Sequence, residues 1–481
     1  KSGTTLESSL LEQHFRSRAA AFDGPQASRR FCAITDPGTA LHRRALEEGY
    51  AAVFSADPSI GGRYSVLSPF GMVPLALMGH DPLALLNDAE WMSRRCGPGG
   101  GSEPNDALWL GTLLGEAAIA GRDKITLCAS ADLASLGEWL EQLLAESTGK
   151  DGRALVPVCG EQLDLMSEYR QDRVFVLLRG PQAESGLWLK EGRALARAGH
   201  PVVIIDVASP RSLGQEFYRW EYATAVAGTL LGVHPFDQPD VEATKVRARQ
   251  LLKAPDARSP AAEAPAGRAK RRYSLALDMG GDPAEGAASP ERIIRAWLSD
   301  PRISYHAILG YLPRTRQTES WLRQWQRRLR RLGGGAVVAG FGPRYLHSCG
   351  QLHKGGPACG AYLFLRMSSQ DTGNTRTLDE LSRCHAAEAR ADLLELRSRG
   401  RPCLSVEFTG TLTQGLRDLA DLLRSALESA ATSEQPPLVR RVRAEVRPSG
   451  SRGLIGWRRG DAARPAQPRS LRTPPATASE A

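Results

Sequence analysis

Short apolar runs of strand length alternate with longer amphipathic segments along most of this chain. The runs are rich in Val, Ile, Leu and Phe, and the segments between them place apolar residues at helical spacing, as in 132–147 and 189–199. This alternation predicts βαβ units, and hence an α/β fold of doubly wound, mainly parallel sheets. In the first half of the chain the predicted strands lie within 29–36, 51–57, 124–130, 154–160, 173–180 and 201–209.

A second α/β block follows a break in this pattern. Residues 254–290 are rich in Ala, Pro, Gly and charged residues, which predicts a flexible linker or insert. Beyond it, helices are expected in 318–333 and 415–430. The strands expected there lie within 303–312, 336–342, 360–367 and 402–410.

The positive charge is concentrated at the C-terminal end. The net charge is +9, but from Arg440 onward ten arginines face three acidic residues, so this end carries +7 and the rest only +2. Residues 433–481 are also rich in Pro, Gly and Ser, which predicts a disordered tail. Because the body is nearly neutral and lacks basic strands interleaved with aromatic residues, we expect no nucleic-acid partner, although a tail that binds polyanions is an alternative.

Length and composition further limit the class of protein that this chain can be. With 481 residues and 42% apolar content, the chain can form two or three domains with substantial cores. We find no apolar run long enough to span a membrane and no leader segment, so we expect a cytoplasmic protein without a membrane partner. The eight cysteines form no CxxC pair, which favours reduced thiols over a disulfide framework or a zinc site.

Two turns carry residues suited to anion binding. The chain begins KSGTTLE, where Lys1, Ser2, Thr4 and Thr5 precede a helical pattern; hydroxyl and N–H groups at the positive end of a helix form a phosphate site. Thr4 or Thr5 could instead only cap that helix, with Glu7 supporting its first turn. In the second turn, GGRYSVLSPFG, Gly61 and Gly62 permit close approach of the backbone, and Arg63 is a suitable partner for an anion or oxyanion.

Four ordered segments resemble the signature segments of glucose-6-phosphate isomerases. They are KSGTTLE, GGRYSVLSPFG, AESTGK and HPFDQPDVEATK. Later stretches, among them QEFYRWEYATAVAGTLLGV and GFGPRYLHSCGQLHKGGP, are most similar to the isomerase half of bacterial bifunctional transaldolase/glucose-6-phosphate isomerases. The resemblance covers about residues 1–430, and it implies interconversion of glucose 6-phosphate and fructose 6-phosphate.

The resemblance also assigns roles to residues. Aldose–ketose isomerisation moves a proton between C1 and C2 through an enediolate, and Glu146 occupies the position of the family's base. Arg63 would stabilise the enediolate charge, with Gly62 beside it at the substrate. Gln238 would bind substrate and Lys245 would open the ring, although outside the motif we would interpret them as a loop residue and a surface residue. The phosphate would be bound by Lys1, Ser2, Thr4 and Thr5.

The chain departs from the family at the ring-opening histidine. That histidine normally lies between the Glu segment and the FDQ segment, where this chain has only His200 before His234, the histidine of the FDQ motif. A similar pattern, LHSCGQLHKGG, follows later, so we expect His347 to open the ring, with His353 as the second candidate or as a phosphate contact. In the remaining alternative neither histidine is catalytic.

The resemblance further implies a domain organisation and partners. Residues 1–78 would be the remainder of a first sugar isomerase subdomain, 79–253 the second, and 291–432 an α/β region that completes the active site. An N-terminal transaldolase domain is expected upstream in the parent protein, and a homodimer is possible. No metal and no organic cofactor is expected, because a proton shuttle needs none. The alternatives are a sugar-phosphate-binding protein without catalysis, a transaldolase activity in this chain, or an inactive fragment.

Overall fold

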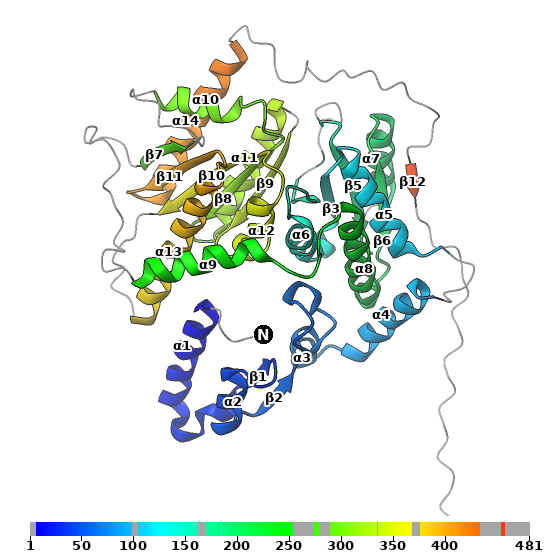
Figure 1. Ribbon diagram of the computed structural model, residues 1–481, viewed down its shortest axis with the longest axis vertical. Coiled ribbons are helices and arrows are strands. Elements are labelled where there is room, and N and C mark those ends of the chain that lie inside the picture. Colours follow the sequence, from blue (N-terminus) through cyan, green and yellow to red (C-terminus); the bar gives the residue numbers. More distant parts are fainter. Residues whose placement is uncertain are drawn as a thin grey trace, which may run out of the picture.

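Three α/β units make up the described part of the chain. The structure is a computed structural model, and it describes residues 6–98, 104–161, 163, 169–183, 185–253, 273–278, 289–333, 335–367, 376–432 and 454–456. Figure 1 shows two larger units side by side and a smaller N-terminal unit below them. None of the helices in these described ranges is both long and apolar enough to cross a lipid bilayer.

The N-terminal unit is small. Its strands β1 (Cys32–Thr35) and β2 (Ala52–Ser55) pair in parallel, with Cys32 opposite Ala52. Thr39 caps the intervening helix by accepting a hydrogen bond from the backbone N–H of His42. Its elements are α1 (Leu6–Asp23), η1 (Gly24–Arg30), β1 (Cys32–Thr35), α2 (Ala40–Glu47), β2 (Ala52–Ser55), η2 (Gly62–Tyr64) and α3 (Pro69–Leu77).

The second unit contains a parallel sheet with strand order β12-β6-β5-β3-β4. Its central strands are continuous apolar runs because helices cover both faces of a parallel sheet. Its strands are β3 (Lys124–Ala129), β4 (Val156–Cys159), β5 (Arg173–Arg179), β6 (Val202–Asp206) and β12 (Leu454–Gly456). Its helices are α4 (Pro82–Cys96), α5 (Asp106–Ile119), η3 (Ala131–Leu133), α6 (Ala134–Thr148), α7 (Ser185–Arg197), η5 (Pro210–Ser212) and α8 (Leu213–Leu231). Helix α9 (Pro239–Lys253) follows in the sequence but packs against the third unit.

The third unit has strand order β7-β11-β10-β8-β9, in which only the pairing of β7 with β11 is antiparallel. Its strands are β7 (Tyr273–Asp278), β8 (Tyr305–Tyr311), β9 (Ala336–Phe341), β10 (Gly360–Met367) and β11 (Cys403–Phe408). Its helices are α10 (Pro290–Leu298), α11 (Arg316–Gly333), η7 (Arg344–His347), α12 (Gly350–Gly355), α13 (Arg376–Ser398) and α14 (Leu412–Thr432). The predicted α/β class with mainly parallel sheets is confirmed.

Two short strands lie within the segments predicted as a linker and a tail. Strand β7 lies within 254–290, where we predicted a flexible linker, and it pairs along its length with β11. Strand β12 lies within the predicted disordered tail and pairs in parallel with β6. Composition averaged over a segment hides such short runs, which can extend the edge of a sheet. The other residues of 254–288 and 433–481 lie outside the described residues.

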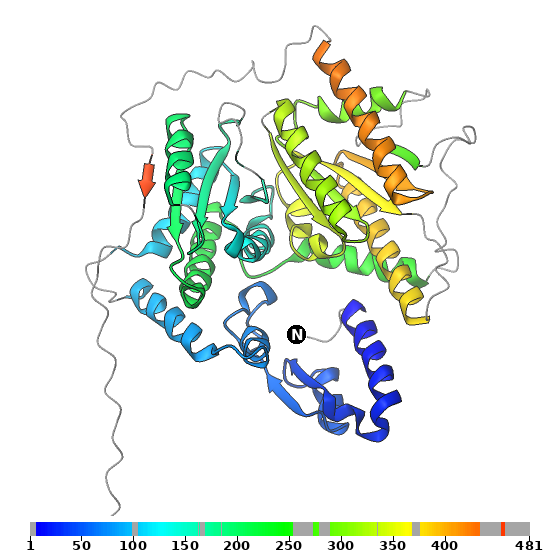
Figure 2. The same ribbon diagram turned by 180° about the vertical axis from the view of Figure 1, so that it is seen from behind.

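The second and third units share one hydrophobic core. A single cluster combines residues of α6 and β4 with residues of β8, β9, β10 and α12, including Ala145, Val156, Ala307 and Leu352. The edge strands β4 and β9 face each other, and Gln326 of α11 donates hydrogen bonds to the carbonyl groups of Cys159 and Val337. Figure 2 shows the two sheets meeting at this boundary from behind. The C-terminal end of α6 therefore lies where both units meet.

Candidate active site

Arg63 lies buried where three chain segments meet. Its guanidinium group donates to Ser147 Oγ at 2.7 Å, to the Pro235 carbonyl oxygen at 2.7 Å and to the Asp237 carbonyl oxygen at 2.8 Å. It also donates to Gln238 Oε1 at 3.0 Å. These bonds fix a cation that is only 2% exposed, and they explain how an arginine is accommodated in the interior.

Glu146 is oriented by two polar partners. Its Oε1 lies 3.4 Å from Arg63 Nη1, and its Oε2 accepts a hydrogen bond of 3.1 Å from Nε2 of Gln142, one turn earlier on α6. The side chain of Glu146 is 13% exposed, whereas that of Arg63 is 1% exposed. The carboxylate therefore has access to solvent while Arg63 contacts it from the buried side. Such a group can exchange a proton with a ligand, and the cation can stabilise negative charge beside it.

The short helix α12 connects the segments around Glu146. Gln351 Nε2 donates to the carbonyl oxygen of Gly149, three residues after Glu146, and Gln351 Oε1 accepts from the backbone N–H of Asp240. A Cβ on Gly149 would collide with the Cα of Leu352, so α12 packs directly against this turn. The end of α6, the start of α9 and α12 are thus fixed relative to one another.

Lys150 adds a second cation to this region. Its ammonium lies 2.7 Å from Asp237 Oδ1 and also bonds the carbonyl oxygen of His234. Burial lowers the pKa of Lys150, and the negative charge of Asp237 opposes that shift. Lys150 closes the AESTGK motif, but its ion pair could not be predicted from the sequence because it depends on a loop more than 80 residues away.

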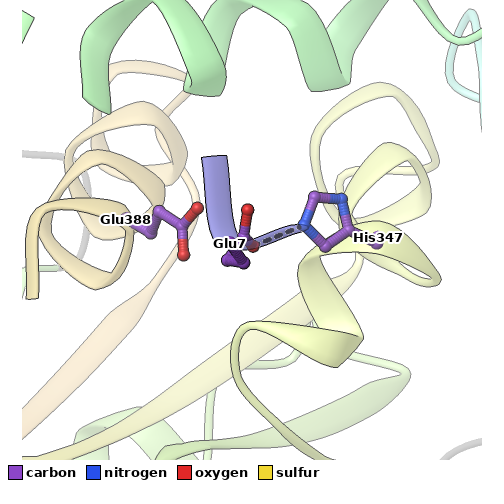
Figure 3. A group of neighbouring side chains, drawn as sticks. All are labelled: Glu7, His347 and Glu388. Atoms are coloured by element: carbon purple, nitrogen blue, oxygen red, sulfur yellow. Dashed lines mark hydrogen bonds and ion pairs between the residues drawn. The ribbon is translucent and has the colours of Figure 1, made fainter. Parts of the chain in front are cut away.

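His347 contacts an acidic residue of the first helix. Its Nε2 lies 3.2 Å from Glu7 Oε1, and Glu388 of α13 faces Glu7 from the other side (Figure 3). The hydrogen bond to His347 is the main cause that lowers the pKa of Glu7, whereas burial and the charge of Glu7 raise that of Glu388. No sequence pattern pointed to Glu388, because an acidic residue in the amphipathic helix 376–398 is typical of an exposed face.

The segment of His347 is attached to the helix of Glu146. Ser348 Oγ donates to Glu141 Oε1 at 3.1 Å, and Nη2 of Arg344 lies 3.5 Å from Glu138 Oε2. Both glutamates lie on α6, so the two candidate catalytic segments contact each other within one chain.

The second candidate histidine lies in the interior. His353 is 1% exposed and packs edge-on against the ring of Tyr362 at a centroid distance of 5.1 Å. Burial lowers its pKa well below the usual histidine value. The neighbouring Lys354 forms a buried ion pair of 2.5 Å with Asp392. His347, with a side chain 38% exposed, is the one of the two that a ligand can reach.

The remaining predicted residues are placed as follows. Gln238 contacts Arg63, and Gly62 precedes Arg63 in η2, where a Cβ would meet no atom within 4 Å. Lys245 lies on α9 with its side chain 40% exposed and pairs with Glu242 Oε2 at 3.4 Å, so the structure gives it a partner on its own helix. Lys1, Ser2, Thr4 and Thr5, the predicted phosphate contacts, lie outside the described residues.

Within the described ranges, one group of side chains has the spacing of metal ligands. One ligand atom each of Glu7, His347 and Glu388 lies within 4.8 Å of the others.

Comparison with known proteins gives relatives for about half of the chain. No family model matches. The glucose-6-phosphate isomerase of Parabacteroides distasonis is 30% identical over 295 residues, which cover 53% of this chain and 66% of that protein. That of Rubrobacter xylanophilus is 33% identical over 291 residues, 51% of this chain and 65% of that protein. The chain thus spans just under two thirds of the length of these curated relatives.

Solved structures give weaker similarities. A hypothetical protein of Thermus thermophilus is 28% identical, with 53% of this chain and 70% of that chain covered and a TM-score of 0.48. A glucose-6-phosphate isomerase of Chlamydia trachomatis is 22% identical, with 54% and 60% covered and a TM-score of 0.43.

Proposed function

We propose that this chain carries the active site of an aldose–ketose isomerase that interconverts glucose 6-phosphate and fructose 6-phosphate. The observation that carries the proposal is the contact between Glu146 and Arg63, which places a partly exposed carboxylate beside a buried, fixed cation. The curated relatives named glucose-6-phosphate isomerase support it.

In the proposed reaction Glu146 shuttles a single proton. The carboxylate takes the proton from C2 of the open-chain aldose, and the electron pair of that C–H bond forms the enediolate. The hydroxyl proton on O2 passes to O1, and returning the first proton to C1 then gives the ketose, so no oxidant or reductant is consumed. Arg63 stabilises the enediolate oxygen, a type of interaction whose loss costs about 3 kcal/mol or more.

The other predicted residues prepare the substrate. His347 is the proposed ring opener, because its imidazole can move a proton near neutral pH and its side chain is accessible. Gln238 and the N-terminal residues Lys1, Ser2, Thr4 and Thr5 are proposed to bind the substrate, and Lys245 to assist ring opening from the same helix that follows Gln238. His353, which is buried among aromatic rings, is assigned no part in the reaction.

The test is a coupled assay in which fructose 6-phosphate is the substrate and glucose 6-phosphate is detected by its dehydrogenase. We expect Glu146→Gln to lower kcat by about 10²–10⁴-fold with little change in KM, since the amide keeps the shape but cannot accept the proton. Glu90→Gln, which changes one member of an exposed ion pair on α4, is the matched control and should retain full activity. In D2O the wild-type product should carry deuterium at the reacting carbon.

Two results would contradict the proposal. Unreduced turnover of Glu146→Gln would remove Glu146 from the mechanism. A wild-type chain that binds the sugar phosphates in calorimetry but shows neither turnover nor deuterium uptake would instead be a sugar-phosphate-binding protein.

A further inference from the structure

Glu7, His347 and Glu388 bring two carboxylate groups and one imidazole together from three separate elements. Glu7 comes from α1, His347 from η7 and Glu388 from α13 (Figure 3). The three ligand atoms lie within 4.8 Å of one another, and Glu7 Oε1 lies 3.2 Å from His347 Nε2. Two ligands bound at about 2.0–2.1 Å in a tetrahedral zinc site are separated by about 3.3 Å. The two closest atoms of the cluster already have this spacing.

Glu388 supplies an independent sign that a ligand belongs here. The residue is only 8% exposed, and among the described residues no N–H or hydroxyl group donates to its Oε2, so the polar group that faces it is the Glu7 carboxyl. Its carboxyl group is directed toward Glu7, as Figure 3 shows. Two carboxylates that face each other repel, and a buried oxygen without a partner is costly. A cation between Glu7 and Glu388 would remove both penalties.

The ligand types indicate which cation fits. Magnesium and calcium prefer oxygen ligands in sets of six or more, whereas one imidazole with two carboxylates is a donor set for zinc and related transition metals. Three protein ligands leave one tetrahedral position open to water. Two carboxylates and a neutral imidazole carry a charge of −2, which a divalent cation neutralises.

We propose that Glu7, His347 and Glu388 bind a divalent transition-metal cation, with Zn²⁺ as the preferred ion. The cation would join α1 to η7 and α13, and so hold the first helix against the third unit.

This site has a consequence that rests on the proposed function. If His347 opens the sugar ring, a cation bound at its Nε2 occupies the atom that would transfer the proton. Zn²⁺ would then inhibit the isomerase reversibly, and a chelator would restore the activity. The cation would thus inhibit the isomerase reaction and take no part in it, since the proposed proton transfer uses Glu146 and no metal.

Metal binding is tested first without any activity. The purified chain is treated with EDTA, dialysed and titrated with ZnCl2 in a calorimeter, and in parallel with CoCl2, whose visible absorption reports four-coordinate geometry. We expect one equivalent per chain. His347→Gln and Glu388→Gln should each weaken binding at least tenfold, since each removes one of three protein ligands, and Glu7→Gln serves as a third variant.

Matched controls separate this site from surface binding. His80→Gln and Glu90→Gln make the same chemical changes at exposed positions and should bind like the wild type. Circular dichroism of each variant identifies any that fails to fold, and the remaining ligand variants then decide the outcome. Absence of saturable binding in the wild type, or unchanged affinity in all folded ligand variants, would overturn the proposed site.

The activity assay distinguishes the two proposals. Zinc binding with no isomerase activity in the metal-free chain would overturn the proposed function and leave the metal site standing. An active chain that neither binds Zn²⁺ nor is inhibited by it would overturn the metal site and leave the proposed function standing.

Discussion

Arg63 and Glu146 lie in contact, with 3.4 Å between Nη1 and Oε1, although 83 positions separate them in the sequence. Arg63 also donates to Ser147, the residue that follows Glu146. The cation is thus fixed to the helix that carries the proposed base. The contributions of the Arg63 charge and of its fixed hydrogen-bond geometry to the proposed reaction can be tested separately.

Arg63→Lys should retain the charge but lose most of the fixed hydrogen bonds. An ammonium group cannot reproduce the planar set of donors that reaches Ser147, Gln238 and the loop carbonyls. We expect kcat of the isomerase reaction to fall by about 10²–10³-fold. Steady-state kinetics with fructose 6-phosphate measures this, and a lysine variant with unchanged kcat would show that only the charge matters.

His347→Gln should impair the opening of the sugar ring and spare the proton transfer. A four-carbon aldose phosphate whose 4-hydroxyl is phosphorylated cannot close such a ring. We therefore expect the variant to lose at least tenfold in kcat/KM with the hexose phosphate and much less with the four-carbon substrate. Equal losses with both substrates would contradict this role.

The same variant tests whether the site is formed within one chain. Because η7 contacts α6 in the same chain, a mixture of Glu146→Gln and His347→Gln should remain as inactive as its components. Recovered activity in the mixture would mean that neighbouring chains exchange these residues.

Gly149→Ala should disturb the turn that follows Glu146. The added Cβ meets the Cα of Leu352, and overpacking of this kind costs about 1–3 kcal/mol. We expect a lower thermal midpoint and a lower kcat. Gly137→Ala on the same helix is the matched control, because its Cβ meets no atom within 4 Å and alanine favours the helix by about 0.5–1 kcal/mol.

Glu161→Gln should destabilise the boundary between the second and third units. Glu161 lies 2.5 Å from Arg173 of β5 and 2.8 Å from Arg330 of α11, and both arginines are fully buried. Removal of the carboxylate leaves two uncompensated cations, at a cost of about 3–5 kcal/mol. Denaturant unfolding measures the loss, with Glu90→Gln as the exposed control. A change below about 1 kcal/mol would mean that the arginines find other partners.

Acid should destabilise the second unit through His200. Burial lowers the pKa of His200 to about 4, from 6.5, so the folded state holds the neutral ring against Phe175 while the unfolded state binds a proton below pH 6.5. Stability is therefore lost as the pH falls from 6.5 to 4, by about 2 kcal/mol at pH 5. His200→Phe should remove this part of the pH dependence, whereas His80→Gln should not. Parallel unfolding curves at pH 7.5 and 5 provide the comparison.

The sequence predicted most of the sheets and little of the polar network. The central strands could be predicted because strands buried on both faces are continuous apolar runs, as in β5 and β10. The short strands β7 and β12 could not, because each needs a neighbouring edge that is supplied far away in the sequence.

In the candidate site, too, individual residues could be predicted from the sequence but their contacts could not. Glu146, Arg63 and His347 came from a family resemblance, and their contacts came only from the structure. Local pattern offered Glu7 as a helix-start residue, whereas its contact with His347 spans 340 positions and depends on how α1 packs. Glu388 had no local signal, since an acidic residue in an amphipathic helix is ordinarily solvated.

The hydrophobic cluster that joins α6 and β4 to the third unit has a consequence for when the proposed activity would arise during folding. Since neither unit can bury these residues by itself, the turn after Glu146 reaches its final position only when both units have docked. Isomerase turnover would then be a late event in folding, and its recovery after dilution from denaturant would time the docking of the two units. Secondary structure, in contrast, would return earlier.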